Sequence, residues 1–246
     1  MIKGLYPFTE YWSQDGSIWI ISDPHFDDSD CKLMDPNWIE PDEQVKRINK
    51  LCGKNDTLIC LGDVGNIKYI RELNAKIKIL IKGNHDKGDS YYQRKFTYFE
   101  QTCPTQADVC EFTKILCTNK FNKNSKTQDI SWRHTRSDGE VIEHLRIQID
   151  NSLFDQVYSG PLFISDRIVL SHAPIDFGDN YDCFFNIHGH EHTLVPKLNH
   201  LNVAANIVDY YPLNLGEIIK DGKLSNVMNF NKKITEKAGE KKNEIK

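Results

Sequence analysis

Three short apolar runs, separated by segments with helical spacing, constrain the fold of this chain more than any other feature of its sequence. The runs span residues 17–22, 57–61 and 77–81, and residues 42–51 and 67–73 between them place apolar side chains at helical intervals. Short apolar runs are typical of buried strands, and their alternation with helices is typical of a parallel sheet with crossover helices. The sequence therefore predicts an α/β fold.

Polar residues that can bind metals follow each of these predicted strands. Asp23 and His25 come after the first strand, Asp63 after the second, and Asn84 and His85 after the third. Ligands of open α/β sheets bind beyond the carboxyl ends of the strands. We therefore expect these side chains to gather at one edge of the sheet.

Histidines take this position in the second half of the chain. Residues 161–170 predict a hairpin whose second strand leads to His172. The apolar run at residues 184–187 leads into a cluster of histidines that begins at His188, and residues 201–208 predict a further strand. The second half therefore adds imidazole ligands to the carboxylates of the first.

A polar insertion separates the two halves at residues 113–151. Within it, residues 130–150 predict a two-stranded hairpin around a glycine turn, with a helix at residues 141–145 as the alternative. We expect a single domain over residues 1–230, with the insertion as a candidate specificity cap. Residues 231–246 are dominated by Lys and Glu and predict a charged, disordered tail.

The composition argues against several functional classes. The formal net charge is -4, so no general basic field favours non-specific nucleic-acid binding. The 7 cysteines include no Cys-x-x-Cys pair, which argues against a disulfide framework and a structural zinc site. The sequence has neither an apolar stretch of about 18 residues nor a signal-peptide pattern, so we expect a cytoplasmic protein without a membrane partner.

The motifs together contain the ligand types of a two-metal hydrolytic site. Two divalent cations about 3.5 to 4 Å apart can activate water and stabilise both oxygens of an in-line displacement at phosphorus. Such a pair needs a bridging carboxylate, neutral imidazoles and further oxygen donors. The chain supplies these ligand types at Asp23, His25, Asp63, Asn84, His172, His190 and His192.

The order of the motifs along the chain resembles that of a known family. Each motif alone is common, but five of them follow predicted strands in the order Asp-x-His, Gly-Asp, Gly-Asn-His-Asp, His and Gly-His-x-His. In this the sequence resembles the calcineurin-like metallophosphoesterase superfamily over residues 18–192, and it is most similar to the small bacterial and phage-type members. The resemblance implies an α/β fold of the four-layer α/β/β/α sandwich type with an inserted segment.

The resemblance also implies a role for each site residue. One metal ion would be held by Asp23, His25 and His192, the other by Asn84, His172 and His190, and Asp63 would bridge the two. His85 would protonate the leaving oxygen or stabilise charge on the phosphoryl oxygens, and Asp86 would orient His85 through a hydrogen bond. Glu191 or Asp176 is a candidate acceptor for the second N–H group of a ligating imidazole.

The histidine cluster allows two registers. His188 and His190 have the same spacing as His190 and His192, so spacing alone does not choose between the pairs. The family motif has a glycine before its first histidine, which matches Gly189 and favours His190 and His192 as ligands. We expect His188 to pack in the interior or to support a ligand.

The expected function is hydrolysis of a phosphate ester by a metal-bridging hydroxide, without a covalent enzyme intermediate. Nitrogen and oxygen donors without thiolate suit Mn, Fe, Zn, Ni or Co, and we expect two Mn ions. The expected substrate is a small phosphoester or nucleotide, cleaved by a phosphodiesterase or phosphatase. A nuclease with the same metal chemistry is the alternative, and a non-catalytic protein-binding scaffold is less favoured.

The insertion bears on the nuclease alternative. Its side chains that could contact phosphates or bases are Lys120, Phe121, Lys123, Lys126, Trp132, Arg133, His134, Arg136 and Arg146. Its acidic side chains, Asp129, Asp138, Glu140 and Glu143, largely offset these charges. A solvated surface of mixed charge is therefore favoured over a nucleic-acid interface.

Overall fold

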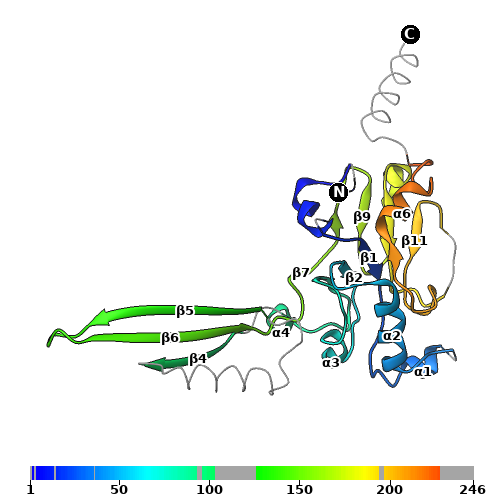
Figure 1. The fold of residues 1–246 in the computed structure, drawn as a ribbon. Coiled ribbons are helices and arrows are strands. Elements are labelled where there is room, and N and C mark those ends of the chain that lie inside the picture. Colours follow the sequence, from blue (N-terminus) through cyan, green and yellow to red (C-terminus); the bar gives the residue numbers. More distant parts are fainter. Residues whose placement is uncertain are drawn as a thin grey trace, which may run out of the picture.

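The structure is a computed structural model that describes residues 2, 4–13, 15–35, 37–92, 96–102, 126–193 and 197–227. Figure 1 shows two β-sheets packed together and a third sheet that extends away from them as an arm. None of the described helices is long and apolar enough to span a membrane.

The first sheet contains the three strands predicted in the N-terminal half. In spatial order its strands are β12 (Leu213–Asn214), β1 (Ile18–Ile21), β2 (Thr57–Cys60), β3 (Ile77–Ile81) and β7 (Gln156–Tyr158). Strands β1, β2, β3 and β7 run parallel, and β12 pairs antiparallel with β1. The predicted parallel arrangement is confirmed.

Helices α2 (Pro41–Leu51) and α3 (Ile67–Ile70) lie in the connections between the parallel strands and cover one face of this sheet. The described helices are η1 (Pro7–Ser13), α1 (Cys31–Met34), α2 (Pro41–Leu51), α3 (Ile67–Ile70), α4 (Asp89–Tyr92), η2 (Gly178–Cys183) and α6 (Leu215–Lys220), where η marks a 3-10 helix. Val45 and Ile48 of α2 and Ile70 of α3 pack with Leu58 and Leu80 of the sheet in one buried cluster. This apolar contact fixes α2 and α3 against the sheet.

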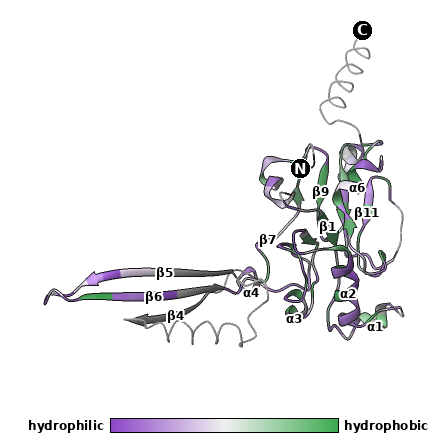
Figure 2. Ribbon diagram, viewed as in Figure 1, coloured by the Kyte–Doolittle hydropathy of each residue, from purple (hydrophilic) through white to green (hydrophobic). Residues whose placement is uncertain are grey.

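The second sheet is built from the C-terminal half and packs on the other face of the first. In spatial order its strands are β11 (His200–Asn202), β10 (Phe185–His188), β9 (Ile168–Leu170) and β8 (Leu162–Phe163). Strands β8 and β9 form the predicted hairpin, and β9, β10 and β11 run parallel. A second buried cluster joins Ile20 and Ile59 to Leu170 and Ile187 across the two sheets, and Figure 2 shows the hydrophobic residues of β1 and β9 there.

The outer face of the second sheet carries polar and aromatic side chains. Phe185 and Ile187 point into the core, so Asn186 between them points outward. Tyr181 of η2 stacks on His200, the β11 residue that pairs with Asn186, with ring centroids 5.2 Å apart. The α/β fold class is confirmed, and a fourth, helical layer on this face stays a prediction.

The arm is a three-stranded antiparallel sheet. In spatial order its strands are β4 (Phe96–Thr102), β6 (Val141–Asp150) and β5 (Lys126–Thr135). Strands β5 and β6 form the predicted hairpin, whose turn contains Gly139 with a φ of 90°. The alternative helix at residues 141–145 is wrong, because β6 pairs with a neighbouring strand along its whole length.

The arm begins earlier in the chain than the sequence suggested. Strand β4 precedes residue 113, where the composition changes, but it pairs with β6. Residues 113–125 of the expected insertion and the expected tail at residues 231–246 lie outside the described residues. The structure therefore describes the arm through its three strands alone.

Two element boundaries differ from the predictions. Helix α2 begins at Pro41 rather than after a cap at Asp42, because the fixed φ of proline suits the first helical position. The strand predicted over residues 201–208 is limited to β11. The chain turns back after Ala204, whose carbonyl accepts the N–H of Val208 at 3.1 Å.

Candidate metal centre

Loops from both sheets meet at one end of the sandwich. Asp23, Asp63 and Asn84 follow β1, β2 and β3, whereas His172 and His190 follow β9 and β10. The backbone N–H of Asp23 donates to the carbonyl of Gly62 at 3.1 Å, which joins the first two loops. The N–H of Gly189 donates to the carbonyl of His172 at 2.8 Å, which joins the loops of the second sheet.

Glycines allow these loops to approach each other closely. A Cβ at Gly62, where φ is 102°, would lie 2.5 Å from the backbone nitrogen of Gly83. A Cβ at Gly83 would collide with the carboxylate of Asp63, and one at Gly189 would collide with that of Asp23. Gly83 and Gly189 are therefore required by the space that the carboxylates occupy, and Gly62 by the space that the backbone of Gly83 occupies.

Four of the predicted ligands have a left-handed backbone. The φ angle is 54° at Asp23, 42° at His25, 49° at Asp63 and 66° at His190. Residues other than glycine adopt this region at a cost on the order of 1 kcal/mol or more, and they cluster at functional sites. The backbone of this region is therefore held in strained conformations that direct the four side chains.

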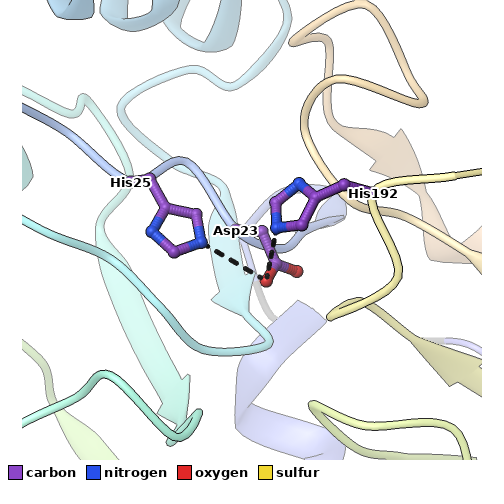
Figure 3. A group of neighbouring side chains, drawn as sticks. All are labelled: Asp23, His25 and His192. Carbon is purple, nitrogen blue, oxygen red and sulfur yellow. Dashed lines mark ion pairs between the residues drawn. The ribbon is translucent and has the colours of Figure 1, made fainter. Parts of the chain in front are cut away.

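Asp23, His25 and His192 form a first group of potential ligands (Figure 3). Oδ1 of Asp23 lies 3.8 Å from Nε2 of His25 and 4.0 Å from Nε2 of His192. Asp23 and His25 are buried, whereas His192 is partly exposed. These are the three side chains that the resemblance assigned to one ion.

Asp63, His172 and His190 form a second group. Nε2 of His172 lies 3.3 Å from Oδ2 of Asp63, 3.1 Å from Nδ1 of His190 and 2.8 Å from Oδ1 of Asn84. Asp63 and His172 are buried, but Asn84 and His190 are exposed. This group is therefore open to solvent on one side.

The carboxylate of Asp63 joins the two groups. Its Oδ2 lies 3.3 Å from Nε2 of His172 and 3.8 Å from Nε2 of His25. Its Oδ1 accepts the backbone N–H of His85 at 2.9 Å, which fixes the orientation of the carboxylate. One carboxylate oxygen thus faces an imidazole from each group, as a bridging ligand must.

Two buried atoms of the first group have no hydrogen-bond partner among the described residues. They are Oδ1 of Asp23 and Nε2 of His25, which lie 3.8 Å apart. Buried polar atoms are normally paired, so two that face each other at a distance too long for a hydrogen bond need another partner. A cation bound to both atoms satisfies them, and the residues present therefore fit a metal ion.

Hydrogen bonds from outside the centre orient three of the imidazole rings. In each ring Nδ1 faces an acceptor: Asp28 for His25 at 3.1 Å, the carbonyl of Leu61 for His172 at 2.8 Å, and Asn206 for His192 at 3.3 Å. A proton on Nδ1 leaves Nε2 free to bind a metal. The three rings are therefore held with their metal-binding nitrogen toward the centre.

Glu191 and Asp176, which the sequence suggested as such acceptors, have other partners. Glu191 accepts from Nζ of Lys197 at 3.0 Å, and Asp176 accepts the backbone N–H of Gly178 at 2.8 Å. Of the three observed acceptors, Asp28 is close enough in sequence to its histidine to be found by spacing. A main-chain carbonyl and a distant asparagine leave no such signal.

His188 lies outside both groups. It is buried, its Nδ1 lies 2.9 Å from the carbonyl oxygen of Gly189, and its ring packs edge-to-face on that of His200 at 5.2 Å. Burial lowers the pKa of His188. The structure thus brings His190 and His192 to the centre, and not His188.

The sequence of the chain matches a known protein family. A family model described as calcineurin-like phosphoesterase matches residues 16–194. The chain belongs to the calcineurin-like phosphoesterase family. Membership of this family implies metal-dependent hydrolysis of phosphoesters.

A solved structure also matches this phosphoesterase. It is described as a protein of unknown function from Aquifex aeolicus, and it is 20% identical over 83% of this chain and 98% of its own, with a TM-score of 0.49. No curated protein matches the sequence.

His85 lies beside both groups of the phosphoesterase without belonging to either. Its ring is exposed and packs edge-to-face on that of His25, with centroids 5.6 Å apart. Its backbone N–H is bonded to Asp63, so the loop places the imidazole next to the two groups. The ring is therefore accessible to a substrate bound at the centre.

Asp86 supports the backbone of the phosphoesterase site rather than His85. Its two oxygens accept hydrogen bonds of 2.9 to 3.1 Å from the N–H groups of Asp63, Val64 and Gly83 and from the hydroxyl of Tyr92. The expected hydrogen bond to the imidazole of His85 is not among these contacts, because four donors already occupy the carboxylate. Asp86 instead holds the loops after β2 and β3 together.

Asp63 and His172 influence each other electrostatically. Burial by itself raises the pKa of Asp63, but the hydrogen bond and charge of His172 lower it overall. Burial likewise lowers the pKa of His172, but the carboxylates of Asp63 and Asp23 raise it overall. The two carboxylates therefore make the centre of this phosphoesterase attractive to cations.

Gly189→Ala tests the close approach of the two sheets. The added Cβ would overlap the carboxylate of Asp23 and the hydroxyl of Ser22. We expect the free energy of unfolding to fall by about 1 to 3 kcal/mol, measured by chemical denaturation. Gly160→Ala is the control, because its Cβ would have nothing within 4 Å, and it should change stability by less than about 0.5 kcal/mol. Equal stability of the two variants would contradict this account.

Proposed function

We propose that this phosphoesterase is a dinuclear metal-dependent hydrolase of small phosphate esters, acting as a phosphodiesterase or phosphatase. The position of Asp63 carries the proposal. Its Oδ2 faces Nε2 of His25 at 3.8 Å and Nε2 of His172 at 3.3 Å, so one carboxylate oxygen serves two groups of ligands. A shared carboxylate suits a pair of cations, because its charge offsets their repulsion.

Seven side chains would hold the two ions. Asp23, His25 and His192 form one set, Asn84, His172 and His190 form the other, and Asp63 is shared. Cys31 is grouped with His25 and Asp28, but burial and the charge of Asp28 raise the pKa of its thiol to about 12. The ligand set is therefore nitrogen and oxygen without thiolate, which suits Mn, Fe, Zn, Ni or Co, and we propose Mn.

Bound at this centre, the two ions would supply an activated water nucleophile and neutralise charge on the phosphate oxygens. The chain contributes the proton that the departing alcohol needs. We assign this step to His85, whose exposed ring lies 5.6 Å from that of His25 and can donate from an imidazole N–H to the leaving oxygen. Asp86 keeps the loop of His85 in place through its bond to the N–H of Gly83.

The charges around the centre favour a small phosphoester over a nucleic acid. Lys82, directly before the Gly-Asn-His-Asp motif, pairs with Asp89, and Lys197 pairs with Glu191 between the two histidine ligands. Nucleic-acid binding rests on several cations that face the phosphates. Lysines that are already paired with carboxylates fulfil this requirement poorly.

The arm supports the same preference. Arg133 pairs with Glu143 at 2.6 Å, and Arg136 pairs with Glu140 at 3.2 Å. The outer part of the arm therefore presents mixed charges. The nuclease alternative has no specific contact in its favour within the described part of the chain.

Metal content and turnover together test the proposed function. Elemental analysis of the purified protein should give about two divalent ions per chain after incubation with Mn. Hydrolysis of bis-p-nitrophenyl phosphate or p-nitrophenyl phosphate should depend on the added metal, and the ratio of the two rates separates diesterase from monoesterase. A protein that binds no metal and hydrolyses neither compound would be a scaffold and not an enzyme.

Asp63→Asn should abolish turnover and lower the metal content below two ions per chain. The neutral amide removes the charge that offsets repulsion between the cations. The measurement is elemental analysis together with hydrolysis of the diester. Asp176→Asn is the control, since Asp176 is exposed and, within the described residues, its side chain accepts only the N–H of Gly178 in its own loop. If Asp63→Asn kept full turnover and two bound ions, the claim that Asp63 bridges the two ions would be wrong.

His85→Ala should lower kcat by about 100- to 10,000-fold, the usual contribution of a general acid. Its metal content should remain near that of the wild type, because His85 lies outside both ligand groups. Steady-state kinetics and elemental analysis give the two values. Asp176→Asn again serves as the control and should keep both values. Loss of metal in His85→Ala would show that His85 is a ligand.

A further inference from the structure

We propose that Asn206 is a positioning residue that fixes the tautomer and ring orientation of His192. Its amide contacts His192 at both ends: Nδ2 donates to the carbonyl oxygen of His192 at 2.9 Å, and Oδ1 lies 3.3 Å from Nδ1 of the ring. The inference rests on the proposed function, because it concerns a ligand of the proposed metal centre. It assigns a role to a residue outside all five motifs.

The carbonyl of His192 determines which way the amide of Asn206 points. A carbonyl oxygen only accepts hydrogen bonds, so the amide nitrogen must face it. Oδ1 then faces the imidazole, and because Oδ1 also only accepts, the proton of the ring must be on Nδ1. Nε2 is left unprotonated, and it is the atom that faces Oδ1 of Asp23 at 4.0 Å.

The backbone on either side of Asn206 is tied to the strand that delivers Asp23. Ala204 forms a parallel bridge with Ser22, and the N–H of Ala205 donates to the carbonyl of Ser22 at 2.8 Å. Ser22 immediately precedes Asp23. Asn206 therefore sets the position of His192 relative to the carboxylate that shares its group.

The turn after Asn206 is strained and anchored at several points. Asp209 and Tyr210 have φ angles of 51° and 59°. Arg47 of α2 binds Asp209 twice, donating to its carboxylate at 2.7 Å and to its carbonyl at 3.1 Å. Tyr210 is buried, and its hydroxyl donates to Asp35 at 3.4 Å. A turn held in this way keeps the amide of Asn206 fixed against the ring.

Another asparagine of the chain offers a matched comparison. The side chain of Asn49 also makes two hydrogen bonds: Nδ2 donates to the carbonyl of Glu72 at 2.9 Å, and Oδ1 accepts the N–H of Asn74 at 2.8 Å. Both side chains are partly buried. The two hydrogen bonds of Asn49 connect α2 to the segment before β3, whereas both hydrogen bonds of Asn206 go to His192.

The test compares Asn206→Leu with Asn49→Leu. In metal-free protein, long-range ¹H–¹⁵N NMR should show His192 protonated on Nδ1 in the wild type and in Asn49→Leu. In Asn206→Leu the proton should shift toward Nε2. Titration with Mn should show affinity for one of the two ions reduced by about 10- to 100-fold in Asn206→Leu, the usual effect of losing such a contact. Asn49→Leu should bind both ions as the wild type does.

Asn206→Asp is the conservative variant that separates positioning from folding. Its carboxylate still accepts from Nδ1, so the Nδ1 tautomer should be retained. It has no N–H to donate to the carbonyl of His192, so the Mn affinity should lie between those of Asn206→Leu and the wild type. An unchanged tautomer and unchanged Mn affinity in Asn206→Leu would overturn the inference, as would equal losses of affinity in the two leucine variants. A wild type that binds no Mn would instead overturn the proposed metal centre, and the NMR spectra would still report the tautomer.

Discussion

The buried carboxylate of Asp63 is the interaction on which the rest of the site depends. Its two oxygens contact the loop after β3 and an imidazole from each ligand group, so β1, β2, β3 and β9 must end at one place. Gly62 and Gly83 leave room for this approach, and Asp86 ties the two neighbouring loops together through their backbone N–H groups. The left-handed backbone at Asp63 costs on the order of 1 kcal/mol or more, and the apolar cluster between the two sheets keeps the strand ends in position despite it.

The parts of the site that follow from strand ends could be predicted from the sequence. Parallel strands bring their carboxyl ends to one edge, so residues such as Asp23, Asp63 and Asn84 gather there whatever lies between them. The glycine before His190 favoured His190 and His192 over His188 and His190 as the histidine pair of the last motif. The structure shows why a glycine is needed there, because a side chain at Gly189 would overlap the carboxylate of Asp23. The apolar runs thus predicted the parallel strands of the first sheet, and the residues after them predicted which side chains gather at its edge.

What the sequence could not predict depends on contacts between distant segments. Asp86 was expected to orient His85, but its neighbours in space are backbone N–H groups of two loops, which no pattern of side chains reveals. Asn206 sits where a continuous strand was expected, and only the turn after Ala204 brings its amide to His192. The pairing of β4 with β6 likewise joins segments separated by a change in composition. Each case is decided by tertiary geometry rather than by local propensity.

Anomalous diffraction from crystals grown with Mn is the most direct test of the account. It predicts two peaks about 3.5 to 4 Å apart, both next to Oδ2 of Asp63, one beside Nε2 of His25 and the other beside Nε2 of His172. A single peak, or two peaks that do not share the carboxylate of Asp63, would contradict the central claim that this side chain joins two metal sites into one centre.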